Sequence, residues 1–251
     1  MPRGESKLWQ RTIEFDEVRK LQLVMVEDPT LEFGGSDAWC SWCVWPAAKV
    51  MIRYLSTFAD DHFQRQSVLE LGSGCGAVGM YMSQRGALPV VLTDVQKALP
   101  LLKRNVLANR LSCEVCPLTW GTAVSRLPGP VRDRAPFDLV LATDCTYDFV
   151  APDRPSPTID ALLMTIQMLG RKALVCASRR PNEIENFEAS LTRAGLKPNI
   201  VYSGKLENPH KEGVEECLVY EFVFGSGQEP QTRDQEKEEA TLPEAASSHA
   251  S

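Results

Sequence analysis

The fold of this chain is decided by one segment, Val68-Leu69-Glu70-Leu71-Gly72-Ser73-Gly74-Cys75-Gly76-Ala77-Val78-Gly79. It predicts a short buried strand that ends in an acid, then a glycine-rich turn, then the start of a helix. A second predicted strand, 89–93, is also followed by an acid, Asp94. Glycines at a strand tip let the backbone approach a ligand closely, and an acid after the next strand can accept both hydroxyls of a ribose. The segment therefore predicts a site for a cofactor that carries a nucleoside.

Two kinds of cofactor compete for this loop. Residues 74–79 fit the dinucleotide pattern G-x-G-x-x-G, and Asp94 lies near the spacing expected for a ribose-binding acid. Glu70 and Gly72, however, extend the pattern to E-x-G-x-G-x-G. An anionic pyrophosphate gains from a helix N-terminus that has no neighbouring carboxylate, whereas an ammonium group and a sulfonium favour an acid there. The loop resembles the first motif of the seven-strand S-adenosylmethionine-dependent methyltransferases, and a nicotinamide enzyme is the alternative.

Length and composition set the class of protein. The 251 residues, 43% of them hydrophobic, suffice for one sizeable domain, and no apolar run approaches the roughly 18 residues of a membrane helix. The N-terminus shows no secretory signal, so we expect a cytoplasmic, and also a nuclear, protein whose eight cysteines are reduced thiols. The net charge of −6 disfavours nucleic acid as a partner, although −4 of it lies in the last 27 residues.

The chain divides into three predicted regions. Residues 1–66 contain an N-terminal hairpin, from the alternation at 8–26, and a cap helix of about 13 residues from Ala47, both packed on the core. Residues 67–224 alternate strand and helix, with strands predicted at 67–71, 89–93, 113–117, 137–142, 172–177, 199–203 and 217–224. Helices are predicted at 96–109, 158–169 and 182–194. Residues 225–251 form an acidic tail that we expect to be disordered.

Three further motifs narrow the resemblance. Val44-Trp45-Pro46-Ala47-Ala48 opens the cap helix, Leu118-Thr119-Trp120-Gly121 follows the third core strand, and Asp144-Cys145-Thr146-Tyr147 follows the fourth. Together with the glycine loop they resemble the family 16 protein lysine methyltransferases, specifically the methyltransferase-like 21 group, whose motif after strand 4 is Asp-x-x-Tyr. The resemblance spans about residues 10 to 224. It implies an α/β, Rossmann-like class I methyltransferase fold: a doubly wound, mostly parallel seven-stranded sheet with one antiparallel strand.

The resemblance also implies a set of site residues. Cofactor contacts are expected at Trp45, Glu70, Gly72, Ser73, Gly74, Asp94, Trp120 and Thr143. Asp94 would take the ribose hydroxyls, Glu70 would lie near the methionine end of S-adenosyl-L-methionine, and Trp120 could pack on the adenine. For Trp45 the alternative is a core or lid tryptophan.

Asp144 and Tyr147 are the candidate catalytic residues. An acceptor lysine must be neutral to attack, and its reference pKa of about 10.4 makes deprotonation at pH 7 cost roughly 4–5 kcal/mol. A carboxylate alone would raise that pKa, so Asp144 is interpreted as an anchor for the incoming ammonium group rather than an activator by charge. Tyr147 would form an aromatic wall or donate a hydrogen bond. The alternative is that the acid caps its loop and the tyrosine is only packed.

The remaining sequence patterns are weaker evidence for function. Cys40/Cys43 and Cys113/Cys116 each form C-x-x-C, but the pairs lie far apart and are interpreted as buried structural thiols, so no metal site is expected. Arg179-Arg180 after the fifth strand could face an acidic substrate or form a solvated pair. The sequence predicts a monomeric protein-lysine N-methyltransferase that acts on a protein partner and not at a membrane. Another acceptor (arginine, histidine or a small molecule) and a non-catalytic binding protein are the alternatives.

Overall fold

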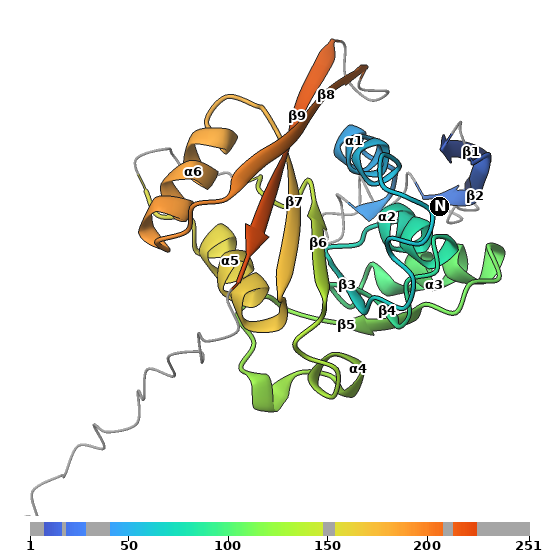
Figure 1. Ribbon diagram of the computed structural model, residues 1–251, viewed down its shortest axis with the longest axis horizontal. Helices are drawn as coiled ribbons and strands as arrows, with labels where there is room; N and C mark the ends of the chain where they lie inside the picture. The colour runs from blue at the N-terminus through green and yellow to red at the C-terminus, as the bar shows by residue number, and fades with distance from the viewer. Residues whose placement is uncertain (1–7, 17–18, 29–40, 148–153, 208–212, 225–251) are drawn as a thin grey trace, which may run out of the picture.

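The computed structural model describes residues 8–16, 19–28, 41–147, 154–207 and 213–224. Figure 1 shows a central sheet with helices on both faces and a two-stranded hairpin at one side. The predicted acidic tail lies outside the described residues. Among the described residues, no helix has both the length and the apolar character needed to cross a membrane.

Seven strands of the described chain form the central sheet. They are β3 (Val68–Leu71), β4 (Val90–Asp94), β5 (Glu114–Pro117), β6 (Leu139–Thr143), β7 (Lys172–Ser178), β8 (Asn199–Glu207) and β9 (Val214–Val223). Their order across the sheet is β5-β4-β3-β6-β7-β9-β8. Strands β3 to β7 pair in parallel and β9 runs antiparallel to both of its neighbours. The predicted seven-stranded, mostly parallel sheet is confirmed.

The order of the strands places a switch point between β3 and β6. From β3 the chain proceeds outward through β4 to β5, then returns to build β6 and β7 on the other side. The connections that leave the carboxyl ends of β3 and β6 therefore run in opposite directions, which opens a crevice at that edge of the sheet. All residues of β3 and β4 are buried, as in strands covered on both faces.

Helices cover both faces of the sheet. They are α1 (Pro46–Leu55), α2 (Ala77–Gln84), α3 (Leu99–Ala108), the single-turn α4 (Gly129–Arg132), α5 (Pro157–Leu169) and α6 (Glu183–Arg193), with a 3₁₀ turn at Val124–Arg126. Helices α1 to α3 lie on one face and α5 and α6 on the other (Figure 1). Each face of the sheet has its own hydrophobic core, and successive residues of β6 alternate between them. Leu139 and Leu141 belong to the core under α1 to α3, and Val140 and Ala142 to the core under α5 and α6.

Helix α1 is shorter than predicted, because it ends at Leu55 rather than after Phe58. The hydroxyls of Ser56 and Thr57 donate hydrogen bonds to the carbonyls of Arg53 and Tyr54. These side chains satisfy carbonyls that a continued helix would have paired, so the helix stops there although the apolar spacing runs on.

The predicted N-terminal hairpin is formed by β1 (Trp9–Asp16) and β2 (Leu21–Glu27). Two asparagines one turn apart hold its inner edge, Asn105 of α3 and Asn109, which follows the last residue of that helix. Asn105 and Asn109 accept the N–H groups of Val26 and Val24, each at 2.7 Å, and their amides donate back to the carbonyls of the same residues. Side chains of a helix thus extend the hydrogen bonding of a strand edge.

Candidate active site

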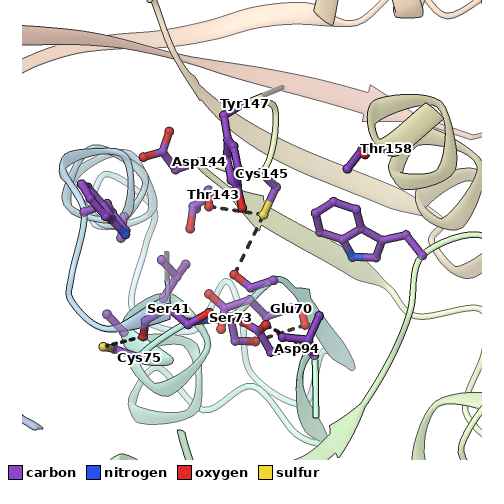
Figure 2. A pocket seen from close by; sticks show the side chains of 18 of the residues that line it. Ser41, Glu70, Ser73, Cys75, Asp94, Thr143, Asp144, Cys145, Tyr147 and Thr158 are labelled. Carbon is purple, nitrogen blue, oxygen red and sulfur yellow. Dashed lines mark hydrogen bonds between the residues drawn. The ribbon is translucent and has the colours of Figure 1, made fainter. Parts of the chain in front are cut away.

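One cavity of about 620 Å³ lies at the carboxyl ends of β3, β4 and β6 (Figure 2). All ten residues that the sequence predicted for the site line it: Trp45, Glu70, Gly72, Ser73, Gly74, Asp94, Trp120, Thr143, Asp144 and Tyr147. In Figure 2, Asp144 and Tyr147 lie on the opposite side of the cavity from Glu70 and Asp94. The fold therefore brings the expected cofactor residues and the expected acceptor residues to one space. Their individual roles stay predictions.

The glycine loop has no room for side chains. Gly72 adopts a φ of +60°, and a Cβ placed there would lie 2.6 Å from Cys145 Sγ and 3.2 Å from the Trp120 ring. Both neighbours line the cavity. Glycine is required here because a side chain would push against the loop after β6 and the tryptophan at once. The loop, Cys145 and Trp120 therefore form one tightly packed wall.

Glu70 lies at the base of the cavity and is 1% exposed. Its Oε2 accepts a hydrogen bond of 3.1 Å from the backbone N–H of Gly79, in the first turn of α2. Burial raises the pKa of this carboxyl to about 8, against the opposing effects of the Gly79 N–H and the Ser73 side chain. A cationic ligand in the cavity would favour the ionised form of Glu70.

Asp94 ends β4, and its carboxylate is already oriented by the backbone. Oδ2 accepts the N–H of Gly74 at 2.7 Å, and Oδ1 accepts the N–H of Val95 at 2.7 Å. Burial raises the pKa of Asp94, and these two N–H groups work against that rise. Oδ2 also accepts a hydrogen bond of 3.5 Å from the Ser41 hydroxyl. A carboxylate has about four acceptor positions, so the carboxylate keeps a free position, on Oδ1, for a ribose hydroxyl.

The two tryptophans differ in their surroundings. Trp45 precedes α1 and packs edge-to-face on the buried Trp42, with ring centroids 6.3 Å apart, while Trp42 also contacts Trp9 of β1. Trp120 is half-buried and lies over the glycine loop at Gly72. An aromatic ring beside a strand tip can stack on a purine, so Trp120 is the better placed of the two for the adenine.

Asp144 has an unusual backbone conformation and an ion pair. It follows β6 with a φ of +55°, and its N–H donates to the carbonyl of Cys176 on β7 at 2.9 Å. Its Oδ2 accepts a hydrogen bond of 2.9 Å from Arg180 Nη2, and the Asp144 side chain is 10% exposed. A positive φ is uncommon in residues other than glycine, and the surrounding structure has to hold it in place. The neighbouring β7 strand and Arg180 together fix where this carboxylate points.

Arg180 was not predicted as a site residue, but it lines the cavity, and its side chain is only 21% exposed, so the interpretation as a solvated residue is wrong for it. Whether it faces an acidic substrate stays a prediction. It is bound by three carboxylates: Asp144 and Glu183, at 2.9 and 3.1 Å, and Glu215 of β9. Burial lowers the pKa of Arg180, but these acids outweigh it and raise that pKa above its ordinary value. Arg179 is the exposed one, and it pairs with Glu216. The available signal was position, because Arg180 follows β7, which adjoins β6 in the sheet.

Of the cysteines predicted to be buried thiols, Cys43 and Cys116 are buried and Cys113 is half-buried. Cys40 lies outside the described residues. All seven described cysteines are free. Cys145, which the sequence did not single out, contacts the carbonyls of Leu71 and Thr143 through its Sγ. Within the described residues, no group of three or more His, Cys, Asp or Glu could hold a metal ion.

Acidic side chains outnumber basic ones in the cavity lining. Four acids line it (Glu70, Asp94, Asp144 and Glu183), and Arg180 is the single basic residue among the described lining residues. Such a field attracts cations and repels an anionic pyrophosphate. The donor set therefore fits S-adenosylmethionine, with its sulfonium and ammonium groups, and fits the alternative nicotinamide dinucleotide poorly. A second cation, the ammonium group of an acceptor lysine, would find a carboxylate at Asp144.

Comparisons with known proteins agree with this chemistry. The model of a family described as lysine methyltransferase matches residues 29–194. The chain is 31% identical over 167 residues to the protein-lysine N-methyltransferase EFM6 of Saccharomyces cerevisiae, covering 59% of this chain and 65% of that protein. It is 37% identical over 107 residues to EEF1A lysine methyltransferase 3 of Xenopus tropicalis, covering 41% and 44%. These matches span roughly half to two thirds of the relatives' own lengths.

Among solved structures, the 16S rRNA N2 G1207 methyltransferase of T. thermophilus, in complex with AdoMet and guanosine, superposes with a TM-score of 0.54. The superposition covers 88% of this chain and 52% of that chain at 16% sequence identity. At this level of identity the likeness shows the methyltransferase fold and nothing about the acceptor.

Proposed function

Because this chain belongs to the lysine methyltransferase family, we propose that it transfers a methyl group from S-adenosylmethionine to the side-chain amine of a lysine in a protein substrate. The observation that carries the proposal is the acidic cavity that joins the glycine loop and Asp94 to Asp144 and Tyr147. The first pair of features suits the cofactor, and the second suits a cationic acceptor.

S-adenosylmethionine, when bound, supplies a methyl group on a sulfonium: the lone pair of the amine nitrogen forms the C–N bond while the S–C bond breaks and leaves a neutral thioether. The chain's residues hold the two reactants. Asp94 offers acceptors for the ribose hydroxyls, Trp120 a face for the adenine, and Glu70 a carboxyl at the base of the cavity. Because the displacement is in line, alignment of donor and acceptor is the main contribution of the protein to the rate.

Asp144 binds the acceptor in this proposal. Its Oδ2 is occupied by Arg180, and Oδ1 receives no hydrogen bond from the described residues. Oδ1 is therefore available to a single donor, such as the ammonium or amine of a lysine. A guanidinium prefers two oxygens in a planar fork, so the arrangement favours lysine over arginine.

The test is transfer of a labelled methyl group from S-adenosylmethionine into the proteins of an undermethylated cell extract. EEF1A, which appears in the names of two relatives, is the first defined acceptor to add. We expect a discrete labelled band with the wild-type protein and none with Asp144→Ala. Asp133→Ala, which removes an exposed carboxylate paired with Arg132 on α4, is the matched control and should retain the band.

Two outcomes of this experiment would contradict the proposal, each in a different part. If the wild-type protein binds S-adenosylmethionine yet labels no protein, the acceptor is a small molecule or the chain is a non-catalytic binding protein. If Asp144→Ala labels as well as the wild type, Asp144 does not bind the acceptor.

The free thiols support a reducing compartment, and we propose the cytosol or the nucleus as the place of the reaction.

A further inference from the structure

Arg180 lies at the centre of a four-member charge cluster beside the acceptor position. Its guanidinium binds Asp144 from the β6 loop, Glu183 from the start of α6 and Glu215 from β9. Asp144, Arg180 and Glu183 line the cavity, whereas Glu215 lies behind them. The side chains of Asp144 and Glu215 are each 10% exposed and that of Arg180 is 21% exposed. The cluster is thus largely removed from solvent.

The proposed reaction makes a conflicting demand on Asp144. A carboxylate within about 4–6 Å of an ammonium group stabilises the charged form and raises its pKa by roughly 1–3 units. The acceptor must nevertheless lose a proton to solvent water before its lone pair can form the new bond. An unscreened Asp144 would bind the lysine well and leave it protonated.

We propose that Arg180 resolves this conflict by screening Asp144, so that the carboxylate positions the acceptor amine without holding it in its protonated form. This proposal rests on the proposed lysine methyltransferase function. Arg180 takes one oxygen of Asp144 and leaves the other for the acceptor, so it fixes the direction of that oxygen while it offsets the charge. It is therefore a positioning residue that acts through Asp144.

Glu183 and Glu215 keep Arg180 in place. They bind the two guanidinium nitrogens, Nη1 and Nε, that Asp144 does not use. Glu183 lines the cavity itself, and the carboxyls of Glu70 and Asp94 lie at its far side. The formal charge of the four-member cluster is −2, and loss of Arg180 makes it −3. Removing Arg180 therefore makes the surroundings of the acceptor more negative by one charge, whatever the total charge around the cavity is.

The neighbouring arginine provides a matched control. Arg179 precedes Arg180 in the same loop, and its exposed guanidinium pairs with the half-buried Glu216 at 3.6 Å rather than with Asp144. Arg179→Gln removes the same charge and the same kind of side chain outside the cluster. A difference between the Gln variants at positions 179 and 180 therefore reports contact with Asp144 and not net charge.

The experiment measures methyl transfer to the labelled acceptor under single-turnover conditions, with the enzyme in excess and at a saturating concentration, from neutral to alkaline pH. Under these conditions the rate titrates the acceptor amine in the bound complex rather than free lysine. We expect Arg180→Gln to move the midpoint of the pH profile upward by about one unit. At neutral pH its rate should fall about tenfold, and the loss should shrink as the pH rises.

Two further variants test the sign. Arg180→Lys keeps the charge, so its midpoint should match that of the wild type. Glu183→Gln removes a negative charge from the same cluster, so its midpoint should move downward. S-adenosylmethionine affinity, measured for every variant, shows whether the fold is intact. If Arg180→Gln does not fold, Arg180→Met, which keeps the length of the side chain and removes its charge, takes its place beside Arg179→Met.

A profile of Arg180→Gln that lies parallel to the wild-type profile, or no downward shift in Glu183→Gln, would overturn the proposal and leave Arg180 a structural role. Absence of lysine labelling by the wild-type protein would instead refute the proposed function. The two failures are therefore distinct.

Discussion

Glu70 Oε2 accepts a 3.1 Å hydrogen bond from the backbone N–H of Gly79, which ties the end of β3 to the first turn of α2. The contact is possible only because residue 79 has no side chain: a Cβ there would lie 2.7 Å from the same oxygen and 2.2 Å from Leu92. This buried hydrogen bond thus joins the two ends of the glycine loop. The same contact removes the carboxyl of Glu70 from water.

The raised pKa of Glu70 predicts that the ligand-free protein loses stability as the pH rises from about 5 to about 8. In the folded chain this carboxyl keeps its proton up to about pH 8, whereas in the unfolded chain it releases it near 4.5. Between those values the unfolded state binds fewer protons, so each pH unit favours unfolding by about 1.4 kcal/mol. Above the folded pKa the penalty stops growing.

Glu70→Gln removes this titration and keeps an acceptor for Gly79. Urea unfolding at several pH values should show that the variant gains stability relative to the wild type as the pH rises. Asp94 is also buried and acts in the same direction, so the difference between variant and wild type is the quantity to compare. A difference that does not change with pH would contradict the assignment.

Gly72→Ala should destabilise the protein by about 2 kcal/mol more than Gly195→Ala. Both glycines have a φ near +60°, so both substitutions introduce the same kind of backbone strain. A Cβ at Gly195 meets nothing within 4 Å, whereas a Cβ at Gly72 meets Cys145 and Trp120. Thermal unfolding compares the two, and equal losses would show that packing at Gly72 adds nothing.

Trp120→Ala should weaken S-adenosylmethionine binding at least several-fold, since stacking of an aromatic pair is worth roughly 0.5–1.5 kcal/mol beyond plain burial. Trp120→Phe should retain most of the affinity. Trp9→Ala, at an exposed tryptophan of β1, is the control and should bind as the wild type does. Isothermal calorimetry measures all three, and unchanged binding by Trp120→Ala would remove this residue from the cofactor site.

Asn105→Ala should destabilise the protein by about 3 kcal/mol, because it removes the Asn105 hydrogen bonds of three buried backbone groups. Asn105 is fully buried, accepts the N–H of Val26 and donates to the carbonyls of Val26 and Cys75. Leu107→Ala, on the exposed side of the same helix, should be nearly neutral. Limited proteolysis of the Asn105 variant should cut the released hairpin first, and an unchanged cleavage pattern would argue against this docking.

The sheet could be predicted from the sequence because its signals are local. Apolar runs such as 90–92 and 139–141 predict buried parallel strands, and the glycine loop predicts which strand is followed by the cofactor turn. The site residues could be predicted because they follow strands whose carboxyl ends share one edge of the sheet. The ion pair between Asp144 and Arg180 could not be predicted from the sequence. It joins two residues 36 positions apart, in different loops, and depends on the direction of both side chains. The same holds for Asn105, whose partners lie on β2 and in the glycine loop.

The most direct test of the central claim is tandem mass spectrometry of the protein labelled by the wild-type enzyme. We expect methyl groups on the side-chain nitrogen of a lysine, at a site that is unmodified when Asp144→Ala is used instead. Methyl groups on arginine or histidine would retain the cofactor site and contradict the assignment of the acceptor.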